Sequence, residues 1–190
     1  MLWLIACATE GPTYSGYDLV DHFPLDGERR WDYASNDTSV THRLDVVLSD
    51  AVVERDGVRI HELSHLSSES GDQLLAVQWS SDTASGVLVH GYDDEQGPVS
   101  FDDPVVFAEP RMVPGDSVSS GDFTSTFVGV EACPNHWTGE DWDSCLHMSL
   151  DGDAPFAGDY WLVPRYGTAW LELRDDTDTW VLVEAEWAPE

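Results

Sequence analysis

The sequence contains no lysine, and all eight of its basic residues are arginine. The acidic residues number 37, so the formal net charge is −29 in a chain of 190 residues. A surface this negative repels phosphate backbones and anionic lipid headgroups. The composition therefore disfavours nucleic-acid binding and electrostatic docking to membranes, and it predicts a solvated, acidic surface.

Long apolar runs are also missing from the sequence. A membrane-spanning helix needs about 20 consecutive apolar residues, and no segment comes near that length. Any membrane attachment would therefore have to come from a covalent lipid. Apolar residues are nevertheless plentiful, since 42% of the chain is hydrophobic and nine residues are tryptophan. A chain of this length and composition can bury the core of one domain.

Cysteine is scarce, and two of the three cysteines suggest a pair. Cys133 and Cys145 flank a polar segment that contains tryptophan. A disulfide between them would close a short loop and stabilise the fold by about 3 kcal/mol in the chain-entropy model. Such a bond requires an oxidising compartment. The alternatives are two free thiols or half of a metal site, and the absence of C-x-x-C spacing argues against the metal site.

The third cysteine, Cys7, ends the segment Leu4-Ile5-Ala6-Cys7, which resembles a bacterial lipobox. The cysteine of a lipobox is lipidated and becomes the mature N-terminus. This resemblance predicts a truncated signal peptide and lipobox at 1–7, a polar tether at 8–16 and one β-rich domain at 17–190. Only six residues precede Cys7 and none is basic, so the expectation requires a start upstream of Met1.

The remaining chain alternates short runs rich in Val, Leu, Trp and Tyr with clusters of Gly, Asp, Ser and Pro. This rhythm is typical of antiparallel strands joined by turns. It predicts an all-β, mainly antiparallel fold with little helix, arranged as a curved sheet, a sandwich or an open barrel. The predicted strands are 30–34, 41–48, 58–63, 74–80, 86–91, 105–108, 123–132, 146–150, 160–163, 168–173 and 180–187. The last strand alternates Val181, Val183, Ala185 and Trp187 onto one face.

Local signals refine this outline at four places. The Asp56-Gly57 pair between apolar residues predicts a hairpin turn. Single helical turns are predicted at 17–22 and 50–54. Prolines recur through 97–116, which predicts an irregular connection or a run of edge segments there.

The segment Phe23-Pro24-Leu25-Asp26-Gly27-Glu28-Arg29-Arg30-Trp31-Asp32-Tyr33 resembles the F-P-L-x-x-G-x-x-W-x-Y opening of uncharacterised bacterial lipoproteins, which follows their anchor. Residues 160–173 are similar to the closing Y-x-x-P-x-x-G-x-x-x-x-E strands of the same group. The resemblance implies an exported β-rich domain at the cell envelope, on the outer membrane or its periplasmic face. It implies no catalytic residues. In the opening, Trp31 and Tyr33 would share one face of a strand.

One motif suggests chemistry. The run His61-Glu62-Leu63-Ser64-His65 is a literal H-E-x-x-H. On a helix, His61 and His65 would share a face and ligate zinc, and Glu62 would act as general base for a bound water. This arrangement would make the chain a zinc metallopeptidase.

The surroundings of the motif favour a strand instead. Val58 and Ile60 alternate with polar residues directly before it. In a strand, His61 and His65 would lie about 13 Å apart, too far to chelate one ion. The extended metzincin pattern also fails, because Ser68 and Gly71 stand where it requires glycine and histidine. The prediction is therefore a strand with no metal, and the zinc site is the alternative.

Weaker candidates are more simply explained as turns or packing. The acidic runs 92–95 and 151–153 offer oxygen ligands for calcium, but neither matches an EF-hand loop. Gly115-Asp116-Ser117 lacks the following glycine of a nucleophile elbow. Trp137 and Trp142 could form an aromatic contact for a glycan or a protein, and core packing is the simpler interpretation.

Three functions remain open. The favoured one is a non-enzymatic envelope lipoprotein, a β-rich binding or structural module whose partner, protein or glycan, is unspecified. The second is the zinc metallopeptidase, which requires a helix at 57–66. The third is a periplasmic carrier of an apolar ligand, which requires a continuous apolar cavity inside the sheet.

Overall fold

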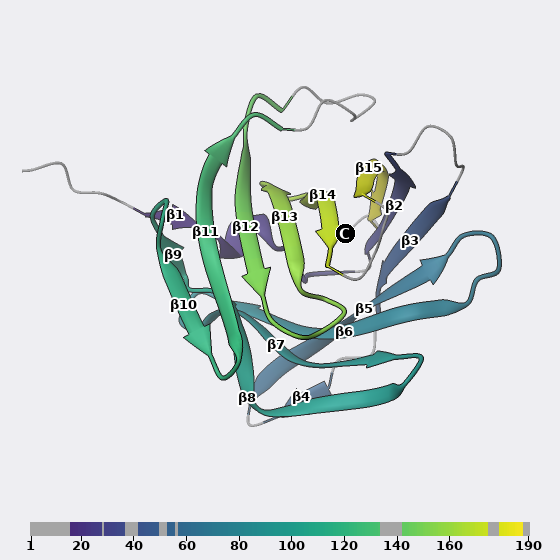
Figure 1. The fold of residues 1–190 in the computed structure, drawn as a ribbon, viewed down its shortest axis with the longest axis horizontal. Helices are drawn as coiled ribbons and strands as arrows, with labels where there is room; N and C mark the ends of the chain where they lie inside the picture. Colours follow the sequence, from purple (N-terminus) through teal and green to yellow (C-terminus); the bar gives the residue numbers. More distant parts are fainter. Residues whose placement is uncertain are drawn as a thin grey trace, which may run out of the picture.

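A computed structural model describes residues 16–27, 29–36, 42–49, 53–55, 57–133, 142–174 and 179–187 (Figure 1). In these ranges every strand pairing is antiparallel. The only helical segment in the same ranges is one 3-10 turn, Val20–His22. The prediction of an all-β, mainly antiparallel fold is therefore confirmed.

Twelve strands follow one another in a curved sheet, in the order β10-β11-β12-β13-β14-β15-β2-β3-β5-β6-β7-β8. Their bounds are β2 Arg29–Ser35, β3 Arg43–Leu48, β5 Val58–Ser67, β6 Gln73–Asp82, β7 Gly86–Asp94, β8 Gly97–Ala108, β10 Ser117–Ser120, β11 Phe123–Glu131, β12 Cys145–Asp151, β13 Gly158–Val163, β14 Gly167–Leu173 and β15 Thr179–Trp187. A short strand β4, Val53–Arg55, pairs with β5, and β1, Tyr17–Asp18, pairs with β9, Arg111–Met112. The sheet wraps around the centre of the molecule (Figure 1).

The two end strands of this sheet, β8 and β10, lie next to each other and nearly close it into a barrel. Side-chain hydroxyls of β10 and of its neighbour β11 bridge this seam to β8. The amide of Val106 donates to Ser120 Oγ at 3.0 Å, and the hydroxyl of Ser125 donates to the carbonyl of Phe107. Of the three predicted architectures, the structure is the open barrel.

One local prediction needs correction, and one of two alternatives is supported at another place. Residues 53 and 54, the described part of the helical turn predicted at 50–54, belong to β4, because the turn at Gly57 (φ 82°) pairs Arg55 with Val58 in a hairpin. Residues 97–108 of the proline-rich stretch 97–116 form the regular strand β8. Because β8 ends the sheet, this part agrees with the predicted alternative of edge segments. Proline lacks an N–H, and an edge strand leaves one row of N–H groups unpaired, so β8 tolerates Pro98 and Pro104.

The core lies inside the barrel and is rich in aromatic rings. Trp31 and Tyr33 of β2 both point into it, as their shared face predicts. The segment before β2 also contributes, since Phe23 packs 4.7 Å from Trp79 and 5.6 Å from Phe107 between ring centroids. We call residues 17–27 the plug, because this segment inserts Phe23 into the core at one end of the barrel.

The antiparallel register shows which elements share the plugged end. The starts of β2, β5 and β14 meet there with the ends of β3, β6, β13 and β15. The β13–β14 turn touches the plug directly, since a Cβ added at Gly167 would lie 3.4 Å from Pro24 Cδ. Within the described ranges, no helix is long and apolar enough to cross a bilayer.

Candidate functional site

The interior of the barrel is filled by side chains. A cavity of about 40 Å³ lies among them, lined by residues that include Tyr33, His65, Trp79 and Tyr160. This volume admits a few water molecules at most, whereas small-molecule ligand sites span about 300–1,000 Å³. Among the described residues, this cavity is too small to be the continuous apolar cavity that a carrier requires.

His65 is an ionisable residue that lines this cavity. Burial lowers the pKa of His65 to about 4, and nearby carbonyls of Leu75 and Leu63 oppose the shift. Two buried nitrogens that line the cavity, His65 Nδ1 and Trp79 Nε1, have no hydrogen-bond partner among the residues that the structure describes. His65 is therefore neutral at pH 7 and belongs to the core.

A larger cleft of about 720 Å³ opens at the plugged end. Its floor is apolar and comes from the plug together with Val58 of β5. Its walls come from the starts of β2 and β5, the end of β6 and the β13–β14 turn. The charged residues that line it are Asp21, Asp26, Arg29, Arg59, Asp82 and Arg165, together with the neutral polar residues His61, Ser80 and Ser81.

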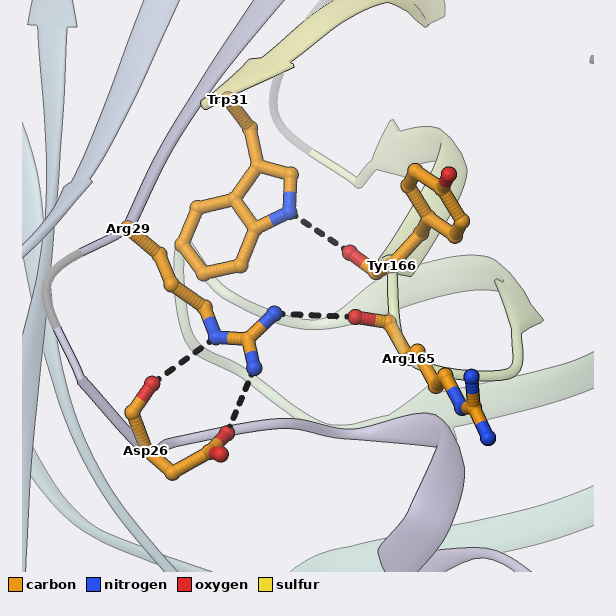
Figure 2. Close-up of polar contacts among 5 residues, drawn as sticks. All are labelled: Asp26, Arg29, Trp31, Arg165 and Tyr166. Carbon is orange, nitrogen blue, oxygen red and sulfur yellow. Dashed lines mark hydrogen bonds and ion pairs between the residues drawn. The ribbon is translucent and has the colours of Figure 1, made fainter. Parts of the chain in front are cut away.

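One wall of the cleft is fixed by donors from β2 (Figure 2). Arg29 Nη1 donates to the carbonyl of Arg165 at 2.9 Å, and Trp31 Nε1 donates to the carbonyl of Tyr166 at 2.6 Å. Tyr33 extends the series with a 2.8 Å hydrogen bond to the carbonyl of Thr168. These three donors alternate along β2, so one face of one strand holds the whole β13–β14 turn.

This turn carries an unusual backbone conformation. Arg165 has φ 69°, the only positive φ at a non-glycine residue in the described part of the chain. Its amide donates to the carbonyl of Asp21 at 3.2 Å, and its carbonyl accepts from Arg29. A left-handed conformation at a non-glycine residue costs about 1–2 kcal/mol, and such strain clusters at functional sites. Contacts on both sides of Arg165 therefore hold it in this conformation.

The charge of the cleft differs from that of the chain. Three of the eight arginines line it, and they balance three aspartates in a protein whose net charge is −29. Asp26 is paired with Arg29 at 2.7 Å. Asp82 accepts hydrogen bonds from the amides of Ala84 and Ser85 at 2.7 and 2.9 Å. The charges of the described residues that line the cleft thus cancel, although the molecule as a whole is acidic.

The cleft also influences the first histidine of the H-E-x-x-H motif. Burial lowers the pKa of His61, the positive charge of Arg59 lowers it further, and Asp26 opposes both effects. His61 is therefore close enough to both charged groups to sense them. Ser81 also lines the cleft, and its buried Oγ has no hydrogen-bond partner in the described part of the chain.

The H-E-x-x-H motif lies in strand β5, as the sequence pattern predicts. Its two histidines face the same way, but His61 lines the cleft and His65 the internal cavity. Strand alternation places Glu62 on the opposite face, where its Oε1 is 3.4 Å from Ser64 Oγ. The described residues contain no group of three metal-ligating side chains. The helix on which the zinc alternative depends is absent from this segment.

The predicted disulfide joins Cys133 and Cys145. Cys145 belongs to a small second cluster of buried residues, against which Trp142 and Tyr166 pack. The rings of Trp142 and Tyr166 lie 5.0 Å apart in an edge-on arrangement. These contacts favour packing as the role of Trp142. Cys7, Trp137 and residues 8–15 of the predicted tether lie outside the described residues.

The remaining candidates lie in turns and strand starts with local partners. Arg174 forms an ion pair with Asp151 and donates to the Gly152 carbonyl at 2.7 Å, so these oxygens of the proposed calcium turn are engaged. Asp94 accepts from the amide of Gln96 at 2.8 Å. Asp116 accepts from a backbone amide, and Ser117 bonds Thr126 across the β10–β11 pair at 2.9 Å.

Comparison of this chain with protein-family models, curated proteins and solved structures found no match. The case for the cleft therefore depends on its geometry. Sequence reasoning did not identify the cleft, because Arg29, Arg59 and Arg165 come from separate parts of the chain. The one usable signal was the scarcity of basic residues, which makes any convergence of arginines notable.

Proposed function

We propose that this chain is an exported, non-enzymatic binding module of the bacterial envelope, held at the membrane by a lipid on Cys7. Its ligand site is the cleft at the plugged end of the barrel. The observation that carries this proposal is the cleft itself, about 720 Å³ in volume and lined by three of the eight arginines. This volume falls within the range of about 300–1,000 Å³ that ligand sites occupy.

Two other observations support the cellular setting. The Cys133–Cys145 disulfide suits an oxidising compartment. The segment that resembles the lipoprotein opening supplies residues 23–27 of the plug and Arg29, so it builds part of one side of the cleft. An opening of this kind after a lipid anchor would hold the barrel near the membrane and leave its surface in solvent.

The two alternative functions receive less support. A metallopeptidase needs Glu62 on the same side as the metal, and β5 directs Glu62 away from both histidines. A carrier needs an interior space, and the cavity of about 40 Å³ beside His65 is too small for a ligand.

The ligand site can be tested by NMR on the purified domain with a broad library of small polar molecules. We expect amide shifts that cluster at Gly57, His61, Ser81 and Arg165. Residues of the seam, such as Ser120, serve as the internal control. Binders whose shifts cluster elsewhere, or a library without binders, would contradict the proposed site.

The anchor can be tested by expressing the gene with its natural upstream sequence in a bacterium fed a labelled fatty acid. The label should enter the protein, and Cys7→Ser should abolish it. Cys133→Ser is the matched control and should leave labelling intact. An unlabelled wild-type protein would rule out the lipid anchor and leave the binding site to its own test.

A further inference from the structure

We infer that the cleft at the plugged end binds an oxyanion, a carboxylate or a phosphate, between Arg59 and Arg165, with the hydroxyl of Ser81 as an additional donor. This inference rests on the proposed function and specifies the ligand of that same site. Four structural features carry it: the two arginines, the fixed turn, the buried hydroxyl and the engaged carboxylates.

The first feature is the state of the arginines. Arg30 and Arg174 lie outside the cleft and form ion pairs with aspartates. Arg29 lines the cleft and forms an ion pair with Asp26. Arg59 and Arg165 also line the cleft, and neither forms an ion pair with a carboxylate in the part of the chain that the structure describes. Guanidinium groups bind carboxylates and phosphates through paired N–H donors.

The second feature is the preorganised backbone at Arg165. Its amide is held by Asp21 and its carbonyl by Arg29, at a φ of 69° that glycine would adopt without strain. A side chain at this position therefore serves a purpose other than local stability. Fixing the base of a long side chain lowers the conformational entropy lost when a ligand binds.

The third feature is the supply of neutral donors. Ser81 presents a buried Oγ without a partner among the described residues, and a buried hydroxyl in that state is costly. Rotation of the Ser81 side chain toward the cleft would let this hydroxyl donate to an oxyanion bound there. His61 lies close enough to Arg59 for their charges to interact, so protonation of His61 would add a third positive charge near the ligand.

The fourth feature is the state of the opposing carboxylates. Asp26 is neutralised by Arg29, and Asp82 is engaged by the turn that follows β6. Asp21 has no ion-pair partner among the described residues, and its charge would disfavour ligands with a second negative group nearby. The apolar floor from Phe23, Pro24 and Val58 suits an uncharged body. The site thus fits one oxyanion attached to a compact neutral group.

The test uses three probes with a common sugar body: glucose, glucuronate and glucose 6-phosphate. Titration of the complete domain, followed by NMR, should show binding of one or both charged probes about tenfold or more tighter than glucose, the scale of hydrogen bonds to a charged group. The tighter of the two identifies carboxylate or phosphate as the source of the oxyanion. Binding should weaken with added salt.

Two double variants with the same net charge separate the site from general electrostatics. Arg59→Gln/Arg165→Gln should weaken the charged probes about tenfold or more. Arg43→Gln/Arg111→Gln, which alters two arginines outside the cleft, should leave their affinity within about twofold, because exposed charges at a distance are screened.

Equal losses in both double variants, or glucose binding as tight as that of the charged probes, would overturn the oxyanion inference. If glucose alone shifts the amides of the cleft, the proposed binding module stands with a neutral ligand. If no probe binds, the oxyanion inference fails, and the broader library decides the proposed function separately.

Discussion

His61 and His65 lie four residues apart on the same face of β5, and they occupy opposite environments. His65 lies in the apolar interior, where burial lowers its pKa to about 4. His61 lies in the cleft, where Arg59 and Asp26 act on it in opposite directions. A strand rises about 13 Å over four residues, and this distance separates the core of the barrel from its end. The interior provides stability, and the plugged end provides the charged groups of the proposed ligand site.

The largest predicted change in stability should come from Phe23, which lines both the internal cavity and the cleft. Phe23→Ala should lower the free energy of unfolding by about 3–5 kcal/mol, because it removes a buried ring that packs on Trp79 and Phe107. Denaturant unfolding measures this change. Val53→Ala is the control, since Val53 is 55% exposed on β4, and it should change stability by less than about 0.5 kcal/mol. A similar small loss for Phe23→Ala would show that the plug is not part of the core.

The second prediction concerns acid stability. His65 has a pKa of about 4 when folded and 6.5 as its ordinary value, so its contribution to stability is complete above pH 6.5 and is lost as the pH falls toward 4. The loss amounts to about 3 kcal/mol. His65→Leu should remove this part of the pH dependence, measured as the free energy of unfolding at pH 7 and pH 4.5.

His61→Gln is the matched variant for this measurement, because it alters the other histidine of the same strand face. It should keep most of the acid sensitivity of the wild type, and protonation of the many carboxylates affects all variants alike. If His61→Gln and His65→Leu flatten the pH dependence equally, the contrast between core and cleft is wrong.

The smallest predicted change in stability concerns Arg165. Two variants of this residue distinguish the contribution of its backbone conformation to stability from the contribution of its guanidinium to binding. Arg165→Gly should raise the free energy of unfolding by about 1 kcal/mol relative to Arg165→Ala, because glycine adopts φ 69° without strain. Both variants remove the guanidinium, so both should weaken oxyanion binding to a similar extent. Thermal unfolding and probe titration measure the two effects on the same samples. Greater stability of the alanine variant would show that the turn is not strained.

The sequence was informative where a rule depends on near neighbours. The period of two along β2 placed Trp31 and Tyr33 on one inward face, and Asp56-Gly57 marked the β4–β5 hairpin correctly. The same rule failed on β15. A bulge between Leu182 and Glu184 shifts the alternation, so Trp180 and Leu182 face the core in place of Val181. A bulge depends on the partner strand and leaves no local pattern.

The candidate site was beyond this kind of inference. Arg29, Arg59 and Arg165 meet only because the barrel brings β2, β5 and the β13–β14 turn to one end. The left-handed conformation of Arg165 was equally invisible, since arginine carries no turn signal. The H-E-x-x-H spacing, by contrast, matched a helical rule that does not apply to a strand.

The pairing of β15 with β2 has a consequence for how the barrel assembles. β2 is synthesised early and β15 last, yet Arg29 lies opposite Trp187 and Ser35 opposite Trp180. Until β15 arrives, one edge of β2 has no partner, and the ring cannot be completed. Contacts so distant in sequence slow folding and prolong the exposure of unpaired strands. In a nascent chain of this protein, the edge of β2 therefore stays unpaired until β15 has been synthesised, and the core faces of Trp31 and Tyr33 can be sealed only at that stage.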